Sequence, residues 1–237
     1  MLLCLVFFYT ICQPIVVMSI HCDGVILLCG RFYVPEKDLD DFAGLVNKVE
    51  KELLKKAGEI CPGDYAPVIT PTPKTTSDTI NEQRTGETIH AIKWGFPTQN
   101  GRPIFNARSE TVHEKPLFKL PFATRRCLIP ARGFFEWKDA ENSKRRIKHY
   151  ITLQNGSLMY LAGIYWFFKD KNGVSIPYFT ILTTEANADI QKLHNRMPIL
   201  IDKENTTDWL YSNNYLDRLK ELMEPSQQGV LSITACE

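Results

Sequence analysis

The chain has 237 residues, of which 44% are hydrophobic, and a formal net charge of +1. A chain of this size buries a core large enough to fold as one domain without disulfides, and its near-neutral charge argues against a uniformly basic nucleic-acid-binding protein. The absence of a C-x-x-C pair argues against a structural zinc site or a dithiol redox centre and favours a reducing compartment. The seven cysteines are scattered: Cys4, Cys12, Cys22, Cys29, Cys61, Cys127 and Cys236.

The chain opens on a hydrophobic leader, residues 1–28. Its first 20 residues carry no charged side chain and are long enough to span a bilayer. Three features argue against a membrane anchor or a signal peptide: no Lys or Arg precedes Arg31, Gln13-Pro14 interrupts the apolar run, and no small-x-small cleavage site follows. We therefore assign residues 29–237 to one domain and expect no membrane association.

Helical and strand patterns alternate along the rest of the chain. Residues 35–58 carry apolar side chains at helical spacing, which predicts one packing helix. β-prone runs bounded by turn residues follow at 87–96, 126–138, 148–154, 158–168 and 176–184. Shorter helical patterns occupy 109–116, 185–193 and 205–224, and a last strand is expected at 229–235. This order predicts an α+β fold, a single β-rich domain with a barrel-like sheet and peripheral helices.

Positive charge is concentrated in the middle of the chain. Residues 91–150 hold 13 Lys and Arg against five Asp and Glu. A focused basic patch attracts polyanions even when the whole chain is nearly neutral. A solvated basic face, such as "KRRIK" at 144–148, explains the same excess, so charge alone leaves both interpretations open.

Four local sequences place polar or reactive residues near strand ends: "CGRF" (29–32), "NARSET" (106–111), "GFFEWK" (133–138) and "LHNRMP" (193–198). Each has a plain structural explanation when taken singly, since Asn106 could cap a turn and His194 could lie near a helix end. Glu136 is harder to explain, because alternation places it on the strand face opposite Phe135 and Trp137. If that face lines a pocket, desolvation would raise the pKa of Glu136 and suit it to general acid-base work.

Together, the four motifs resemble the SRAP (SOS response-associated peptidase) family, whose members shield abasic sites in single-stranded DNA. The resemblance covers residues 29–237, and the motifs occur in the family's order with similar separations. It implies that Cys29 is the crosslinking residue, that Asn106 and Glu136 form the active-site polar pair, and that His194 is the catalytic histidine. It also implies four DNA-binding residues: Arg31, Arg108, Trp94 and Arg196.

The same resemblance implies a cytoplasmic, DNA-associated monomer that binds single-stranded DNA containing abasic sites, without a metal or other cofactor. In this family the mature chain begins at the cysteine of the first motif. A cysteine with a free α-amine condenses with the aldehyde of a ring-opened abasic deoxyribose, first to an imine and then, by thiol attack, to a thiazolidine. Glu136 and His194 would supply the proton transfers, and the imine would also permit β-elimination, so a lyase side activity is expected.

In the chain as written, the α-amine of Cys29 is blocked by the peptide bond from Leu28. We therefore expect translation to begin at residue 28, read as Met and later removed, with residues 1–27 untranslated. Two alternatives stay open. Cys29 and His194 would also suit a cysteine-nucleophile peptidase or amidase that releases the leader by self-cleavage, and a membrane-anchored binding module would rest on the leader alone.

The chain departs from the family pattern after Trp94-Gly95. The stretch "FPTQNGRP" has no aromatic residue between Phe96 and Phe105, whereas many members carry a proline-and-tryptophan loop there that is thought to wedge between bases. The sequence therefore leaves open how far bases are unstacked beside the lesion.

Overall fold

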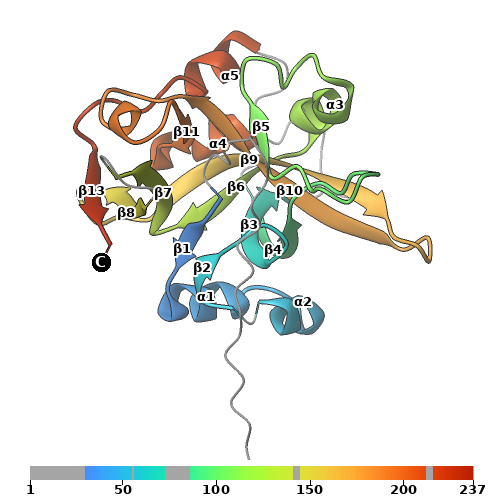
Figure 1. The fold of residues 1–237 in the computed structure, drawn as a ribbon. Helices are drawn as coiled ribbons and strands as arrows, with labels where there is room; N and C mark the ends of the chain where they lie inside the picture. Colours follow the sequence, from blue (N-terminus) through green and yellow to red (C-terminus); the bar gives the residue numbers. More distant parts are fainter. Residues whose placement is uncertain (1–29, 55, 73–85, 141–144, 212–215, 237) are drawn as a thin grey trace, which may run out of the picture.

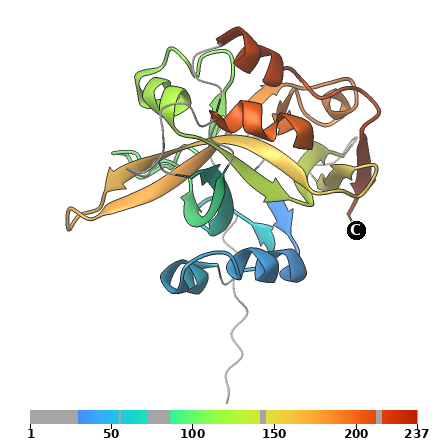
Figure 2. The ribbon, with the colours of Figure 1, turned by 180° about the vertical axis from the view of Figure 1, so that it is seen from behind.

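A computed structural model describes residues 30–54, 56–72, 86–140, 145–211 and 216–236. Its strands form two sheets, one of five strands and one of eight, with short helices around them (Figure 1). The view from behind shows the same arrangement, with a long two-stranded ribbon projecting from one side (Figure 2).

The larger sheet contains a closed barrel. Its five strands are β3 (Tyr65–Pro71), β4 (Glu87–Trp94), β6 (Arg126–Ala131), β9 (Met159–Lys169) and β10 (Ser175–Glu185). They follow the order β10-β4-β3-β6-β9, and β9 pairs with β10 to complete the ring. Three short strands extend this sheet: β5 (Asn106–Arg108), β11 (Arg196–Pro198) and β12 (Leu200–Ile201). The closed barrel confirms the predicted fold, a single β-rich α+β domain.

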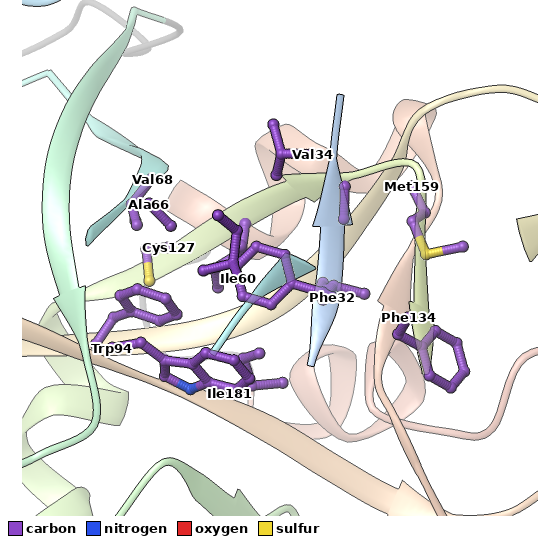
Figure 3. Close-up of a cluster of buried hydrophobic side chains, with 14 of the residues drawn as sticks. Phe32, Val34, Ile60, Ala66, Val68, Trp94, Cys127, Phe134, Met159 and Ile181 are labelled. Atoms are coloured by element: carbon purple, nitrogen blue, oxygen red, sulfur yellow. The ribbon is translucent and has the colours of Figure 1, made fainter. Parts of the chain in front are cut away.

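The smaller sheet is antiparallel throughout. Its strands, in spatial order, are β13 (Leu231–Ala235), β8 (Arg146–Leu153), β7 (Gly133–Asp139), β1 (Phe32–Val34) and β2 (Gly58–Ile60). The inner face of this sheet packs on the barrel, and the ring centroids of Phe32 and Trp94 lie 5.0 Å apart. Figure 3 shows Phe32 and Phe134 from the smaller sheet in one cluster with Trp94 and Ile181 from the barrel. The two sheets therefore share one core.

The helices lie at the periphery. They are α1 (Glu36–Ala43), α2 (Lys48–Leu53), α3 (Pro116–Thr124), α4 (Thr206–Tyr211) and α5 (Leu216–Leu222), with 3₁₀ turns η1 (Ile190–Lys192) and η2 (Lys203–Asn205). Helices α1 and α2 lie together at one end of the molecule, beside β1 and β2 (Figure 1). Among the described residues, no helix has the length and apolar character needed to cross a bilayer.

The single helix predicted for residues 35–58 is wrong, because two short helices form there. Helix α1 ends at Ala43, and α2 starts after Asn47. The Asn47 side chain accepts a hydrogen bond from the Glu50 amide at 2.9 Å and completes a capping box. This cap starts a new helix inside the apolar pattern, and Leu45, in the connection, is 68% exposed.

Three other predicted elements differ. The helix predicted at 185–193 is wrong, since β10 continues to Glu185 and only the 3₁₀ turn η1 forms before Leu193. The β-prone run 126–138 divides at Arg132 into β6 and β7, which belong to different sheets. At this residue the chain passes to the smaller sheet: the Arg132 amide donates to the Tyr33 carbonyl of β1 at 2.9 Å, and its side chain donates to the buried Asp38 carboxylate of α1 at 3.1 Å. The helix predicted at 109–116 is wrong, since turns occupy most of this stretch and α3 only begins at Pro116, where proline is favoured.

Candidate functional site

The motifs "CGRF" and "GFFEWK" lie side by side on the smaller sheet. The Phe135 amide donates to the Arg31 carbonyl at 2.9 Å, and the Arg31 guanidinium lies 5.2 Å from the ring centroid of Trp137. Cys29 lies outside the described residues, which begin at Gly30. The strand that follows the expected crosslinking residue is thus paired directly with the strand that carries Glu136.

The motif "LHNRMP" contacts the motif "NARSET". Arg196 forms a bidentate ion pair with Glu110 of "NARSET", with one N···O distance of 2.9 Å. Arg146, at the start of β8, donates to the Trp137 carbonyl at 3.3 Å, and its charge acts on His194. Contacts therefore join the four motifs in two pairs, CGRF with GFFEWK and NARSET with LHNRMP, and the two pairs are related only by the charge of Arg146 acting on His194.

Glu136 is 1% exposed and lies on the inner face of β7, opposite the face that presents Phe135 and Trp137. Its cross-strand neighbour on β8 is His149. The His149 ring Nδ1 lies 3.1 Å from the Ile147 carbonyl, and its side chain lines a cavity of about 460 Å³ beside η1. A carboxylate in this position is shielded from bulk water and is suited to holding or moving a proton.

Asn106 is the first residue of β5 and pairs in register with Ile181 of the barrel strand β10. Trp94 supports this strand, because its indole N–H donates to the Phe105 carbonyl at 2.9 Å. Trp94 itself is 0% exposed and stacks on Phe179. The expectation that Trp94 contacts DNA is therefore wrong for its side chain, which packs in the core and holds the strand that carries Asn106.

Arg196 is also placed differently from the sequence prediction. The residue is 7% exposed. Its guanidinium donates to the Thr183 carbonyl at 2.7 Å and is paired with Glu110. Partial burial alone would raise the pKa of Glu110, but the hydrogen bonds and charge of Arg196 outweigh it and lower that pKa. Arg196 thus ties β11 to β10 and to the turn after β5, and its charge is already paired with Glu110.

His194 is half-buried, just after η1. The Arg196 amide donates to its Nδ1 at 3.0 Å, so the neutral ring carries its proton on Nε2. Burial lowers the pKa of His194 below its ordinary value of 6.5, and the charges of Arg146 and Arg196 lower it further. At neutral pH His194 is therefore an uncharged imidazole that presents an Nε2–H donor.

Arg108 and Arg31, the other two arginines predicted to contact phosphates, lie at the surface. Arg108 is exposed at the end of β5, and within the described residues no ion pair joins it to a carboxylate. The Arg31 side chain is 39% exposed. The sequence marks 144–148 as basic but does not show that Arg146 and Lys148 lie on the same face of the smaller sheet as Trp137.

Comparison with known proteins agrees with this arrangement. Residues 28–237 match the family described as SOS response associated peptidase (SRAP). Abasic site processing protein YoaM of Bacillus subtilis is 32% identical over 205 residues, which cover 84% of this chain and 86% of YoaM. Abasic site processing protein YoqW of the same organism is 30% identical and covers 84% of this chain and 87% of its own length.

Solved structures share the fold. A crystal structure of a protein from Bacteroides thetaiotaomicron superposes with a TM-score of 0.71 at 21% identity, covering 88% of this chain and 92% of that chain. A protein from Bordetella bronchiseptica gives a TM-score of 0.66 at 19% identity. With the family match over residues 28–237, these findings show that the chain belongs to the SOS response associated peptidase (SRAP) family.

Proposed function

We propose that this protein binds single-stranded DNA at abasic sites and forms a covalent thiazolidine link to the lesion through the α-amine and thiol of Cys29. The observation that supports this most is the pairing of the strand after Cys29 with the strand that carries Glu136. The Arg31 carbonyl, two residues after Cys29, accepts a hydrogen bond from the Phe135 amide next to Glu136, and the charge of Arg146 on the neighbouring strand acts on His194. Relatives at 30% and 32% identity carry the name abasic site processing protein, which points to the same lesion.

The proposed reaction requires proton transfers but no oxidant or reductant. The α-amine attacks the C1′ aldehyde carbon of the ring-opened deoxyribose, and the carbinolamine loses water to give an imine. The thiol then adds to the imine carbon while its proton passes to the nitrogen, which closes a five-membered thiazolidine. The chemical demand on the protein is therefore to place proton donors and acceptors around one carbon atom.

The described residues supply such groups. The buried carboxylate of Glu136 would exchange protons with the amine and with the departing water. The Nε2–H of neutral His194 would donate a hydrogen bond to the sugar oxygen as the ring opens, since its Nδ1 is already occupied by the Arg196 amide. Asn106 would orient the sugar from β5. Loss of a proton from C2′ of the imine would lead to β-elimination, a lyase side reaction of the same intermediate.

Phosphate contacts would give affinity without reading bases. Arg31 and Arg108 are the exposed cations of the motifs, and the chain's positive charge is concentrated in residues 91–150, which include β5, β7 and the start of β8. Contacts to the backbone carry no sequence information, which suits a protein that must recognise a missing base in any context.

A comparison of two chains tests the proposal. One starts at Met1, and in the other a methionine replaces Leu28, so that its removal exposes the Cys29 amine. Only the second is expected to give a covalent band shift with abasic single-stranded DNA, because imine formation requires a free α-amine. No shift from either chain, or turnover of peptide substrates without DNA, would favour the peptidase alternative instead.

His194 is expected to act as a neutral hydrogen-bond donor. His194→Ala should slow crosslinking by about 10- to 100-fold, since loss of a buried donor costs about 1–3 kcal/mol. His194→Gln should recover part of the rate, because its amide N–H₂ can donate from a similar position. The rates are measured from pH 5 to 8 with the chain that begins at Cys29.

The lowered pKa sets the pH window of that comparison. The rate ratio of wild type to His194→Gln should be constant above pH 6.5 and change only below it, where the wild-type imidazole becomes charged. His194 should also cost stability below pH 6.5, because the unfolded chain then binds a proton more readily than the folded chain. A ratio that already changes above pH 6.5 would contradict a neutral His194.

A further inference from the structure

The outer face of the smaller sheet carries two cations that converge on one carboxylate. Glu59 of β2 accepts a hydrogen bond from Arg31 Nη1 at 2.9 Å and another from Lys148 Nζ of β8. All three side chains are partly exposed: 39% for Arg31, 25% for Lys148 and 33% for Glu59. We call Arg31 and Lys148 the outer cation pair.

Aromatic rings form the floor beneath this pair. Lys148 Nζ lies 4.1 Å from the ring centroid of Phe135 and 6.0 Å from that of Trp137, and the Arg31 guanidinium lies over Trp137. Phe135 and Trp137 lie two residues apart on β7, so both rings lie on the same face of the sheet. On β8 their partners in register are Tyr150 and Lys148. Phe135 is 6% exposed, so the partly exposed Trp137 is the ring that a strand could reach. Cations beside an accessible aromatic ring are the combination that binds single-stranded nucleic acid, with phosphates on the cations and a sugar or base against the ring.

The outer cation pair holds more positive charge than Glu59 neutralises. Burial alone would raise the pKa of Glu59, but the hydrogen bonds from Lys148 and Arg31 outweigh it and lower that pKa, so Glu59 is ionised at neutral pH. Two cations around one carboxylate leave a net positive charge. A phosphate that replaced the carboxylate would make the same charge-assisted hydrogen bonds with more acceptor oxygens.

We propose that Arg31 and Lys148 form a seat for one phosphate of the strand beside the lesion, and that Glu59 occupies this seat until DNA displaces it. The inference rests on the proposed function and adds two residues to it: Lys148 as a binding residue and Glu59 as a built-in competitor. Such a competitor lowers the affinity for undamaged strands, so that retention on DNA depends on the covalent step.

The test measures noncovalent binding. The chain that begins at Cys29 is titrated with single-stranded DNA containing a tetrahydrofuran, an abasic analogue that has no aldehyde, at several salt concentrations. Lys148→Gln should weaken binding severalfold and reduce the slope of log K against log salt by about 0.7, the contribution of one phosphate contact on a single strand. Glu59→Gln should tighten binding by about threefold, because a neutral amide holds the two cations less strongly than a carboxylate and is more easily displaced by a phosphate.

Lys171→Gln is the matched control. It removes the same charge at the exposed turn between β9 and β10, on the opposite side of the molecule from the smaller sheet (Figure 1). If Lys148→Gln behaves like Lys171→Gln, the phosphate seat is refuted. If Glu59→Gln binds more weakly than wild type, Glu59 positions the cations and does not compete. If wild type itself does not bind single-stranded DNA, the proposed function fails, which is a separate outcome. Thermal unfolding of each variant shows whether the fold is kept.

Discussion

Replacing Cys29 by alanine, in the chain that begins at this residue, is expected to abolish the heat-stable crosslink to abasic single-stranded DNA. The α-amine is still present in Cys29→Ala, so the imine should form and should be trapped by borohydride. Without the thiol, the imine cannot close to a thiazolidine, and it either hydrolyses or undergoes β-elimination. Strand cleavage should therefore increase. Denaturing gels with and without borohydride measure the crosslinked, trapped and cleaved species together.

The control for this experiment is Cys61→Ala, which removes a half-buried thiol of the loop before β3. It should crosslink as well as wild type. A heat-stable crosslink that survives in Cys29→Ala would show that another nucleophile attacks the lesion, and the thiazolidine proposal would be wrong. Loss of the trapped imine together with the crosslink would mean that the amine of residue 29 does not reach the aldehyde.

Glu136→Gln is expected to slow crosslinking by about 100- to 10,000-fold, the usual contribution of a well-placed general acid-base group. Glutamine has nearly the same shape, so it leaves no cavity at a position that is 1% exposed. Noncovalent binding to the tetrahydrofuran strand should stay within about twofold of wild type, because Glu136 faces inward from β7. Single-turnover rates with excess protein measure the chemical step apart from binding.

Glu221→Gln provides a matched carboxylate change, on the exposed surface of α5, where Glu221 pairs with the neighbouring Arg218. Its rate should equal that of wild type. A Glu136→Gln variant that folds normally and crosslinks at the full rate would show that the buried carboxylate has a packing role alone. Equal losses of binding and of rate would place Glu136 in DNA contact rather than in proton transfer.

Periodicity predicted the strands well and the helices less well. Each β-prone run forms strand in the structure. Alternation and a high content of β-branched or aromatic residues indicate a strand regardless of the sheet that the strand joins. The runs do not say which sheet a strand joins, so the division at Arg132 was missed. The helix at 35–58 was predicted as one element because its apolar spacing continues through the break. The capping box of Asn47 and Glu50 is the local signal that could have found that break.

At the candidate site, the sequence indicates which residues carry the relevant chemistry, but except for Glu136 it does not indicate whether their side chains point outward or into the core. Alternation correctly placed Glu136 opposite Phe135 and Trp137. A motif letter does not show whether an arginine or tryptophan points outward, and both Trp94 and Arg196 are buried. Their partners, the Phe105 carbonyl and Glu110, lie 11 and 86 residues away in sequence, beyond any local pattern. The roles proposed for Cys29, Asn106, Glu136 and His194 stay predictions until the variants are measured.

Strand β1 is only three residues long, yet it is paired on both edges, with β2 on one side and β7 on the other. Chain ends usually fray unless a sheet holds them. If the mature protein begins at Cys29, its first residues lead directly into this doubly held strand, in which Phe32 is 0% exposed. Folding would then preorganise the reactive end and raise the effective concentration of amine and thiol at a bound aldehyde. Substitutions that loosen β1 should accordingly slow capture of the lesion under conditions where the rest of the protein is still folded.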